Sequence, residues 1–495
     1  MKKIFFLMLF PLILKGQNIY DAVDWSTDDE YGNARYSSMS GAFGATGGNL
    51  SAISINPASG SVFDLSRFGG TIQIYNQSIN SSFKGSVNKT KQNFNNFQFG
   101  LVYVLKNYGK SNLKKLAFGI NHQIQNSFNL NIHTIGRSQK SVDSFFLNNA
   151  SESSIDNLNV SNNESISSVY RWLGENYGYP DQQAFLAYQS YLINYDEDSG
   201  SFYSNAIINS EINIENFLFS TGNNSLTSLN FSGQFKNLFC GINININEIN
   251  NNKEFIHQEK NFDSQSPITS VDFRNYLNSN GYGISAQLGL IYLLNKLRLG
   301  FSYNTPTYYN FTDELEQYIK TESIDLNGNQ YEDILAPSII NIYDYNFKSP
   351  SRIIFSLASI LKNKFLVNID LMLKNYNGAK FENTFYETYS TLNSQIKNNL
   401  KSTLDFKLGG EYKINNVSLR AGYKRVENPF KNFDKKFLSS VSFGFGFDFD
   451  NSTIDFSFSV TEKNYNYQMF DSGLTDLSKI NDKQKRFGLT YNIIF

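Results

Sequence analysis

The sequence predicts an all-β fold, a closed antiparallel barrel of 14 strands that crosses a membrane. Three observations predict it: an aromatic composition, a period-two alternation of apolar residues, and connections that alternate between short and long. The 495 residues include 31 Tyr and 44 Phe but only 8 Pro, and 40% are hydrophobic. A membrane barrel needs such an average, because lipid-facing and lumen-facing side chains alternate along each strand.

Residues 1–16 have the features of a secretory signal peptide. Two lysines precede an apolar run from Ile4 to Leu14, which is too short to cross a bilayer as a helix, since about 20 residues are needed. We expect cleavage after Gly16 and export to the outer membrane of a Gram-negative cell. The single cysteine, Cys240, cannot form an internal disulfide, so export is inferred from the signal alone.

Residues 17–66 are predicted to form a separate N-terminal segment. They are rich in glycine and other small residues and lack a strand pattern, so they are too irregular to face lipid. They form either a leader in the periplasm or a plug, here called the hatch, inside the lumen. The plug is favoured because six apolar residues would otherwise be exposed, namely Phe43, Leu50, Ile53, Ile55, Phe63 and Leu65. A 14-stranded barrel is wide enough to hold such a segment.

Residues 67–495 show the period-two pattern of strands. Alternate residues are apolar from Val441 to Phe449 and again from Phe487 to Phe495, where the chain ends on an aromatic residue. An apolar face of this kind could pack on a second sheet or face lipid. The strands expected are 68–76, 95–105, 115–132, 226–235, 238–249, 281–294, 297–305, 351–360, 364–374, 403–414, 417–425, 437–449, 452–462 and 486–495.

The connections between these strands decide in favour of a membrane barrel. Tight turns alternate with long segments, the longest at 133–225, 250–280 and 306–350, as expected of periplasmic turns and extracellular loops. An even strand number then places both barrel ends in the periplasm. Within 133–225, apolar residues recur at helical spacing around Val169 and Phe185. This loop either covers the barrel mouth with short helices or packs only on itself.

The segment 35–58 ends in Asn56, Pro57 and Ala58, which match the NPA motif of a known hatch. The segment resembles the N-terminal hatch of the FadL/TodX family, whose members are 14-stranded outer-membrane channels for long-chain fatty acids or aromatic hydrocarbons. The resemblance implies passive transport of a small hydrophobic compound, gated by the hatch and released sideways beside the third strand. The hatch residues expected to contact it are Phe43, Leu50, Ile53, Ile55, Asn56, Pro57 and Ala58.

The third predicted strand, 115–132, offers candidates for this lateral gate. One face carries apolar residues from Leu116 onward but is interrupted by His122 and Asn126. An unsatisfied polar group in hydrocarbon costs roughly several kcal/mol. The strand therefore either opens or kinks near Asn121, His122 and Asn126, or it stands above the membrane there. The large early loop departs from the family, whose bulky loops come later.

Other functions are disfavoured by composition. The net charge of -1 provides no field to attract nucleic acid. The three histidines lie in no nucleophile motif, so we expect neither an enzyme nor a cofactor or metal site. A non-transport role in adhesion or as a scaffold for secretion machinery stays open, whereas the plug weakens an open porin. The expected partners of this monomer are a hydrophobic molecule, outer-membrane lipid and barrel-assembly machinery that binds Phe495.

Overall fold

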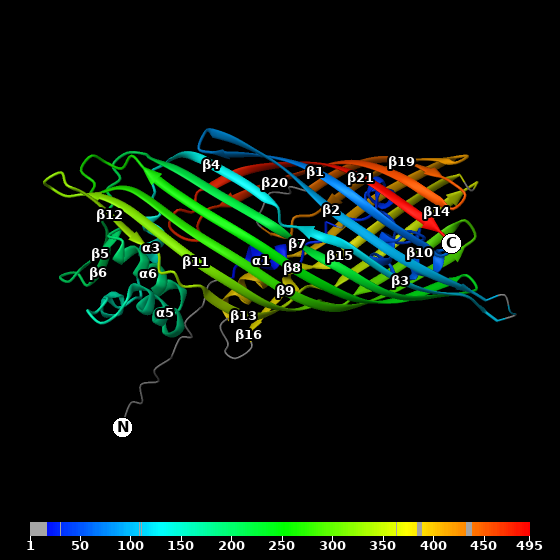
Figure 1. The fold of residues 1–495 in the computed structure, drawn as a ribbon, viewed down its shortest axis with the longest axis horizontal. Helices are drawn as coiled ribbons and strands as arrows, with labels where there is room; N and C mark the ends of the chain where they lie inside the picture. The colour runs from blue at the N-terminus through cyan, green and yellow to red at the C-terminus, as the bar shows by residue number, and fades with distance from the viewer. Residues whose placement is uncertain are drawn as a thin grey trace, which may run out of the picture.

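The protein forms a closed antiparallel β-barrel of 14 strands, as predicted (Figure 1). The structure is a computed structural model that describes residues 17–495, except for 30, 108, 110, 363, 384–388 and 432–437. The predicted signal peptide, 1–16, and the first residue of the predicted strand 437–449 lie outside the described residues. Neighbouring strands of the barrel are antiparallel throughout the described ladders.

Ten of the barrel strands are continuous and four are interrupted. The continuous strands are β1 (Arg67–Phe83), β2 (Ser86–Lys106), β7 (Ile212–Phe235), β8 (Leu238–Lys260), β9 (Ile268–Leu294), β17 (Ser402–Ile414), β18 (Val417–Val426), β19 (Leu438–Asp448), β20 (Ser452–Gln468) and β21 (Leu477–Ile494). The interrupted ones are β3 (Leu113–Ser127) with β4 (Leu130–Ser138), β10 (Leu297–Asn304) with β11 (Tyr308–Ile324), β13 (Asn341–Lys348) with β14 (Arg352–Leu361), and β15 (Phe365–Asn375) with β16 (Lys380–Asn383). The short β12 (Gln330–Leu335) extends the sheet beside β11.

The barrel closes where the first strand meets the last. Arg67 of β1 is opposite Ile494 of β21, and the amide of Phe495 donates to the carbonyl of Ser66 at 3.0 Å. The tight turns lie at this same end. Several begin with a residue in the left-handed region, such as Asn295 at φ 54°. Both ends of the barrel and its short turns therefore share one side, as the parity of the strands predicts.

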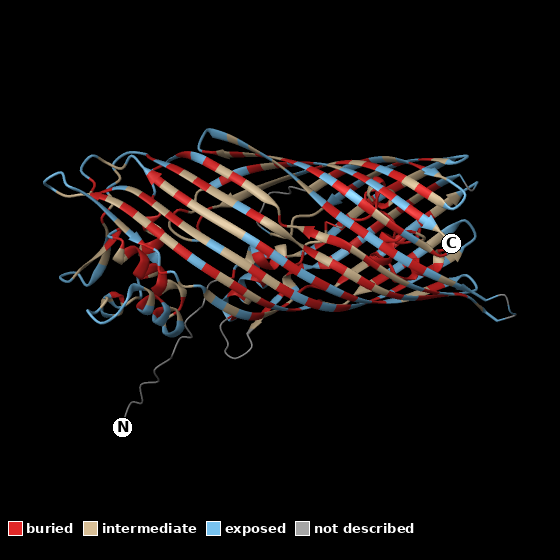
Figure 2. Cartoon of the chain, viewed as in Figure 1, coloured by how far each residue is buried: buried red, intermediate tan, exposed pale blue. Residues whose placement is uncertain are grey.

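The outer face of the wall is apolar where the sequence predicts it. Phe443 and Phe487 are 55% and 52% exposed, and the other alternate residues of their runs also point outward. Burial alternates along the strands (Figure 2). An exposed apolar face that encircles a closed barrel is the surface that lipid requires.

The strands extend far beyond their predicted bounds at the end opposite the short turns. β8 and β9 leave only 261–267 between them, where a loop over 250–280 was predicted, and β11, β12 and β13 occupy much of 306–350. The predicted loop bounds are therefore wrong. The added residues, such as Asn250, Asn251 and Asn252, are polar on both faces. They carry no apolar alternation, although their main chains still pair across the ladder.

The connection between β4 and β7 forms a lid of helices. It contains α3 (Asp143–Ala150), α4 (Ile155–Leu158), α5 (Ile166–Asn176), α6 (Tyr179–Gln189) and a hairpin of β5 (Ile193–Asp196) and β6 (Ser201–Ser204). The lid lies at the end of the barrel remote from the C-terminus (Figure 1). Its apolar residues share a core with inward residues of the wall, including Phe273 and Ile319, so the helices cover the mouth. Another helix, α7 (Ser390–Asn399), and the turn η3 (Tyr376–Gly378) share a second core with Ala22 and Trp25 of the N-terminal segment.

The N-terminal segment lies inside the barrel. Its elements are α1 (Ile19–Asp24), α2 (Ala34–Ser38), η1 (Ser51–Ser54) and η2 (Pro57–Val62). In Figure 1 they lie within the lumen, with α1 midway along the axis and the others toward the short turns. None of the described helices is both long and apolar enough to cross a membrane. The elements of the hatch position most of the residues considered below.

Candidate functional site

The predicted motif Asn56, Pro57 and Ala58 joins the hatch to the main chain of the wall. Asn56 caps η2 by accepting from the amide of Ala58 at 3.1 Å. Its Nδ2 donates to the carbonyl of Gly44 at 2.7 Å and to that of Leu290 in β9 at 3.1 Å. One amide side chain thus organises the hatch and attaches it to the barrel.

Inward-facing glycines make this close approach possible. A Cβ added to Gly289 would lie 2.1 Å from Asn56 Oδ1, and one added to Gly241 would lie 2.5 Å from the carbonyl oxygen of Pro57. On the next strand, a Cβ at Gly300 would lie 2.6 Å from the carbonyl oxygen of Gly44. These contacts are too short for any side chain, so β8, β9 and β10 each need a glycine at that level.

The predicted apolar hatch residues are buried in packing contacts. Phe43 and Ile55 pack with Ile354 and other wall residues, and Leu50 and Ile53 pack with Val102 and Ala117. All four are at most 1% exposed. The structure thus places them between hatch and wall, and their contact with a transported molecule stays a prediction.

The three predicted gate residues lie where β3 separates from β2. The ladder between these strands ends at the pair Phe99 and His122 within the described residues. Asn121 faces the hatch and donates to Ser54 Oγ at 3.0 Å. His122 faces outward, with Nδ1 2.9 Å from Thr227 Oγ1 and its ring stacked on Phe99.

Asn126 does not share the outer face of His122, contrary to the pattern in the sequence. A bulge between Ile124 and Asn126 reverses the alternation, and Asn126 Nδ2 donates to the carbonyl of Asp24 in the hatch. β3 ends at Ser127, and β4 resumes the pairing with β7 at Leu130. We call residues 123–127 the β3 gap. In the described ladders none of them pairs with β2, and all but Gln125 pair with β7.

The hatch fills the β3 gap from inside. The amide of Asp29 donates to the carbonyl of Gln125 at 2.8 Å, and that of Tyr31 donates to the carbonyl of Ile124 at 3.0 Å. Tyr31 and Ile124 form an isolated antiparallel bridge. A short piece of the hatch therefore takes the place beside β3 that β2 leaves.

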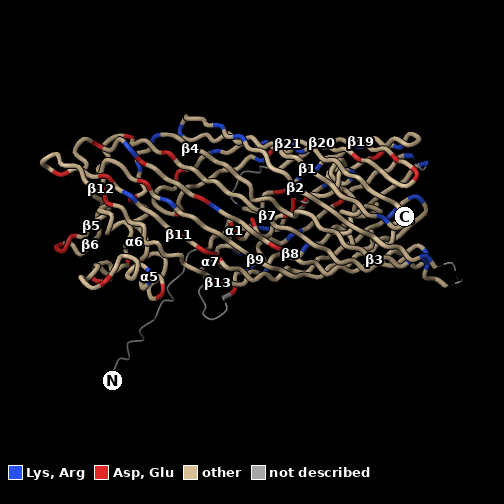
Figure 3. The backbone as a smooth tube through the Cα atoms, in the orientation of Figure 1, with Lys and Arg blue, Asp and Glu red and all other residues tan. Residues whose placement is uncertain are grey.

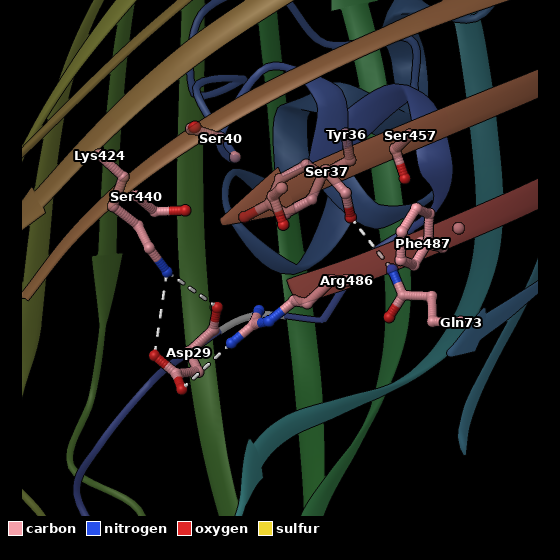
Figure 4. Close-up of a pocket in the computed structure, with 13 residues that line it drawn as sticks. Asp29, Tyr36, Ser37, Ser40, Gln73, Lys424, Ser440, Ser457, Arg486 and Phe487 are labelled. Carbon is pink, nitrogen blue, oxygen red and sulfur yellow. Dashed lines mark hydrogen bonds and ion pairs between the residues drawn. The ribbon is translucent and has the colours of Figure 1, made fainter. Parts of the chain in front are cut away.

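Sequence reasoning missed an acidic stretch just before this bridge. We call residues 21–29 the strap, because its carboxylates reach cations on several strands of the wall. Asp28 lies 2.6 Å from Lys374 Nζ and 3.3 Å from Arg352. Asp29 lies 3.0 Å from Lys463 and 3.5 Å from Arg486 (Figure 4). Figure 3 shows Asp, Glu, Lys and Arg on the elements around α1.

These ion pairs keep both carboxylates charged. Burial alone raises the pKa of Asp28, but Lys374 and Arg352 outweigh it, and the pKa of Asp28 falls to about 2. Burial also opposes the ionisation of Asp29. Its neighbouring cations, Lys463 first, nevertheless hold the pKa of Asp29 well below the usual range. The strap could have been recognised in the sequence by its high density of Asp within a segment already predicted to lie in the lumen.

A small polar cavity lies beside Asp29 (Figure 4). Its volume of about 30 Å³ accommodates about two water molecules. Its lining includes Lys424, Arg486 and hydroxyl groups of the hatch and wall, such as Ser37, Ser440 and Ser457. This cavity is too small to hold an organic molecule. No group of three or more His, Cys, Asp and Glu residues with the geometry of a metal site occurs in the described part of the chain.

The fold and the site define a 14-stranded barrel whose lumen holds an N-terminal hatch hydrogen-bonded to the wall. No family model and no curated protein matches the chain. Among solved structures, the toluene transporter TodX of Pseudomonas putida is similar, with a TM-score of 0.52 and 15% identity over 94% of this chain and 99% of that one. A FadL homologue of Pseudomonas aeruginosa gives 0.53 at 11% identity, over 94% and 99%. The monoaromatic hydrocarbon channel CymD gives 0.51 at 12% identity, over 95% and 99%. The predicted FadL/TodX resemblance is therefore confirmed for the fold.

Proposed function

We propose that the protein is an outer-membrane channel through which small hydrophobic molecules diffuse passively. Its exposed apolar wall suits lipid, and its fold is shared with proteins described as a toluene transporter and a monoaromatic hydrocarbon channel. Because these neighbours are transporters and channels, they support a role without catalysis. Export by the signal over 1–16, assembly through Phe495 and a monomeric state belong to the same proposal.

The observation that carries the proposal is the pairing of the hatch with the β3 gap. The same segment that lies in the lumen pairs with β3 where β2 has left it, through the bridge between Tyr31 and Ile124. Movement of this segment would therefore open a path along the lumen and a path through the wall together. A hydrophobic molecule then leaves sideways into lipid, where its transfer from water is favourable.

The predicted site residues take two roles in this scheme. Phe43, Leu50, Ile53 and Ile55 hold the body of the hatch against the wall, while Asn56 to Ala58 anchor it. Asn121 and His122 border the gap, and Asn126 lies within it. Asn126 changes its contact when the hatch moves, because it donates to the hatch carbonyl of Asp24.

A disulfide across the bridge tests the scheme. In a Cys240→Ser background, Tyr31→Cys with Ile124→Cys should close the gap, since the two residues are direct antiparallel partners. Proteoliposome flux of a labelled fatty acid or toluene should fall when the disulfide forms and return on reduction.

The matched control is Asn250→Cys with Asn280→Cys, a pair of partners on β8 and β9 away from the gap. This disulfide should leave flux unchanged. Equal flux through the oxidised and reduced Tyr31 and Ile124 variant would rule out gating at this bridge. A folded barrel that passes no hydrophobic probe would instead favour the non-transport role.

A further inference from the structure

The strap places an aromatic ring in a cage of aromatic residues. Trp25 is 2% exposed, stacks on Phe311 with ring centroids 5.1 Å apart, and meets Phe128 edge-on at 5.3 Å. Phe311 in turn stacks on Tyr345, with centroids 5.1 Å apart and ring planes 6° apart. We call the wall residues of this cluster the aromatic cage; they are Phe128, Tyr309, Phe311, Tyr345 and Phe347.

The indole N–H of Trp25 makes no hydrogen bond among the described residues. The Nε1 atom is buried. A buried donor without an acceptor is costly, whereas the ring faces are well packed. The cage therefore suits a planar aromatic ring better than it suits an indole with its N–H.

Lys374 lies beside a further aromatic residue of the cluster that contains Trp25 and the cage. Lys374 Nζ lies 5.4 Å from the ring centre of Tyr376, which belongs to the same cluster as Trp25. Lys374 Nζ also donates to the main-chain carbonyl of Ser26, next to Trp25, and to the carboxylate of Asp28. Arg352 adds a second contact to Asp28. An aromatic ring and a carboxylate three residues apart in the strap thus occupy adjoining sites on the wall.

We propose that the aromatic cage with Lys374 and Arg352 is a binding site for an aromatic carboxylate, and that Trp25 and Asp28 occupy it while the channel is closed. The inference rests on the proposed transport function and specifies its substrate class. The ring of the ligand takes the place of Trp25, and its carboxylate takes the place of Asp28. A neutral aromatic hydrocarbon would offer no carboxylate to Lys374 and Arg352, and a saturated carboxylate would lack ring stacking.

Competition between strap and ligand follows from this arrangement. Each ligand molecule must displace the Trp25 ring and the Asp28 carboxylate, so weakening the strap strengthens ligand binding. A purely structural ion pair predicts the opposite, because its loss would only loosen the site. The direction of the effect of Asp28→Asn therefore separates the two interpretations.

Tryptophan fluorescence of the full chain provides the direct measurement. The chain has two tryptophans, so Trp172→Phe leaves Trp25 as the only reporter. The probes are 3-phenylpropionate, propylbenzene and hexanoate, which carry both groups, the ring alone, and the carboxylate alone. We expect 3-phenylpropionate to shift the Trp25 emission to the red and to bind about tenfold more tightly than either other probe.

Two variants test whether the carboxylate of the ligand binds Lys374 in place of Asp28. Lys374→Gln should weaken 3-phenylpropionate about tenfold and leave propylbenzene unchanged, because only the acid uses the cation. Asp28→Asn should tighten 3-phenylpropionate and is expected to fold, since it removes the carboxylate and keeps the shape. Lys413→Gln, an exposed lysine paired with Asp448 at the short-turn end, is the control and should change neither.

Several results would overturn the inference. The first is that propylbenzene or hexanoate binds as tightly as 3-phenylpropionate or more tightly. The second is that 3-phenylpropionate does not shift the emission of Trp25. The third is that Asp28→Asn binds 3-phenylpropionate more weakly than the chain with Asp28. Flux separates this failure from failure of the proposed function. If propylbenzene or a fatty acid crosses proteoliposomes but the aromatic acid is not preferred, only the substrate class is wrong. If no probe crosses, transport itself is wrong.

Discussion

Asn56 of the hatch donates from Nδ2 to the main-chain carbonyl of Leu290 in the barrel wall at 3.1 Å. The same amide group bonds to the carbonyl of Gly44, so a single side chain joins two parts of the hatch to one strand. The contact involves the main chain of the wall, which a substitution on β9 cannot remove. The amide of Asn56 is therefore the part of the contact that mutation can test.

Asn56→Ala should loosen the hatch without preventing assembly of the barrel. It leaves a capping amide and two buried carbonyls with fewer partners, at a cost of about 1–3 kcal/mol. We expect faster proteolysis within 50–62 and a higher leak of small solutes in liposomes. Asn252→Ala, on an exposed part of β8, is the control. Unchanged proteolysis in Asn56→Ala would show that the motif is not an anchor.

Gly289→Ala should reproduce this effect from the side of the wall. The new Cβ would lie 2.1 Å from Asn56 Oδ1 and 2.6 Å from Pro57 Cδ, so the hatch must shift. Gly70→Ala is the matched control, because its Cβ would meet nothing closer than a carbonyl oxygen at 4.0 Å. Leak and proteolysis should rise in the first variant only. Equal behaviour of the two variants would contradict the close approach.

The strap should be held most firmly near pH 4. The pKa of Asp28 is lowered from 3.8 to about 2, so its stabilisation is present above pH 4 and is lost as the pH falls toward 2. Burial raises the pKa of Asp24 to about 6, so its contribution is present below pH 4 and is lost as the pH rises through 6. Each shift of about two pKa units corresponds to about 2–3 kcal/mol.

Hydrogen exchange of residues 19–31 measures this pH dependence. Asp24→Asn should remove the loss of protection between about pH 4 and 6 and keep the loss below pH 4. Asp28→Asn should do the reverse, because it removes the group that must stay ionised. Identical pH profiles for the two variants and the unaltered protein would exclude these carboxylates as the cause.

Glu259→Ala should release the first helix of the lid. Glu259 lies on β8, is fully buried, and accepts from the amide of Val142 at 2.8 Å and from His257 Nε2 at 2.9 Å. Its loss leaves buried donors unpaired, which costs about 1–3 kcal/mol. Hydrogen exchange should rise in 143–150, whereas Glu254→Ala, at a more exposed position on the same strand, should leave it unchanged.

The fold was predictable wherever one face of the wall must be apolar. The run from Val441 to Phe449 alternates because its two faces meet different surroundings, and this alternation predicts a strand directly. The extensions around Asn250 and Asn280 carry no such contrast, so no pattern marked them as strands. Helices within 133–225 were predicted because apolar residues such as Val169, Leu173 and Phe185 recur at helical spacing. In the structure these residues of α5 and α6 share a core.

The candidate site was predicted less completely. Asn56 could be found because it lies in a motif, and the irregularity of β3 because His122 interrupts an apolar run. The partners of Asp28 and Asp29 could not be found. Lys374 and Arg486 are more than 300 residues away in sequence, and only the closed barrel brings them to the strap.

The two ends of the hatch are held by different kinds of force, and this difference predicts how the hatch would leave. Around Asn56 the contacts are neutral hydrogen bonds and close packing on glycine, which a change of pH hardly affects. Along the strap they are buried pairs of opposite charge, which dissolved ions screen little but which acid breaks by protonating the carboxylates. Strong acid should therefore release the hatch first at its N-terminal end while η2 stays in place, so that the hatch opens on a tether rather than as a loose plug.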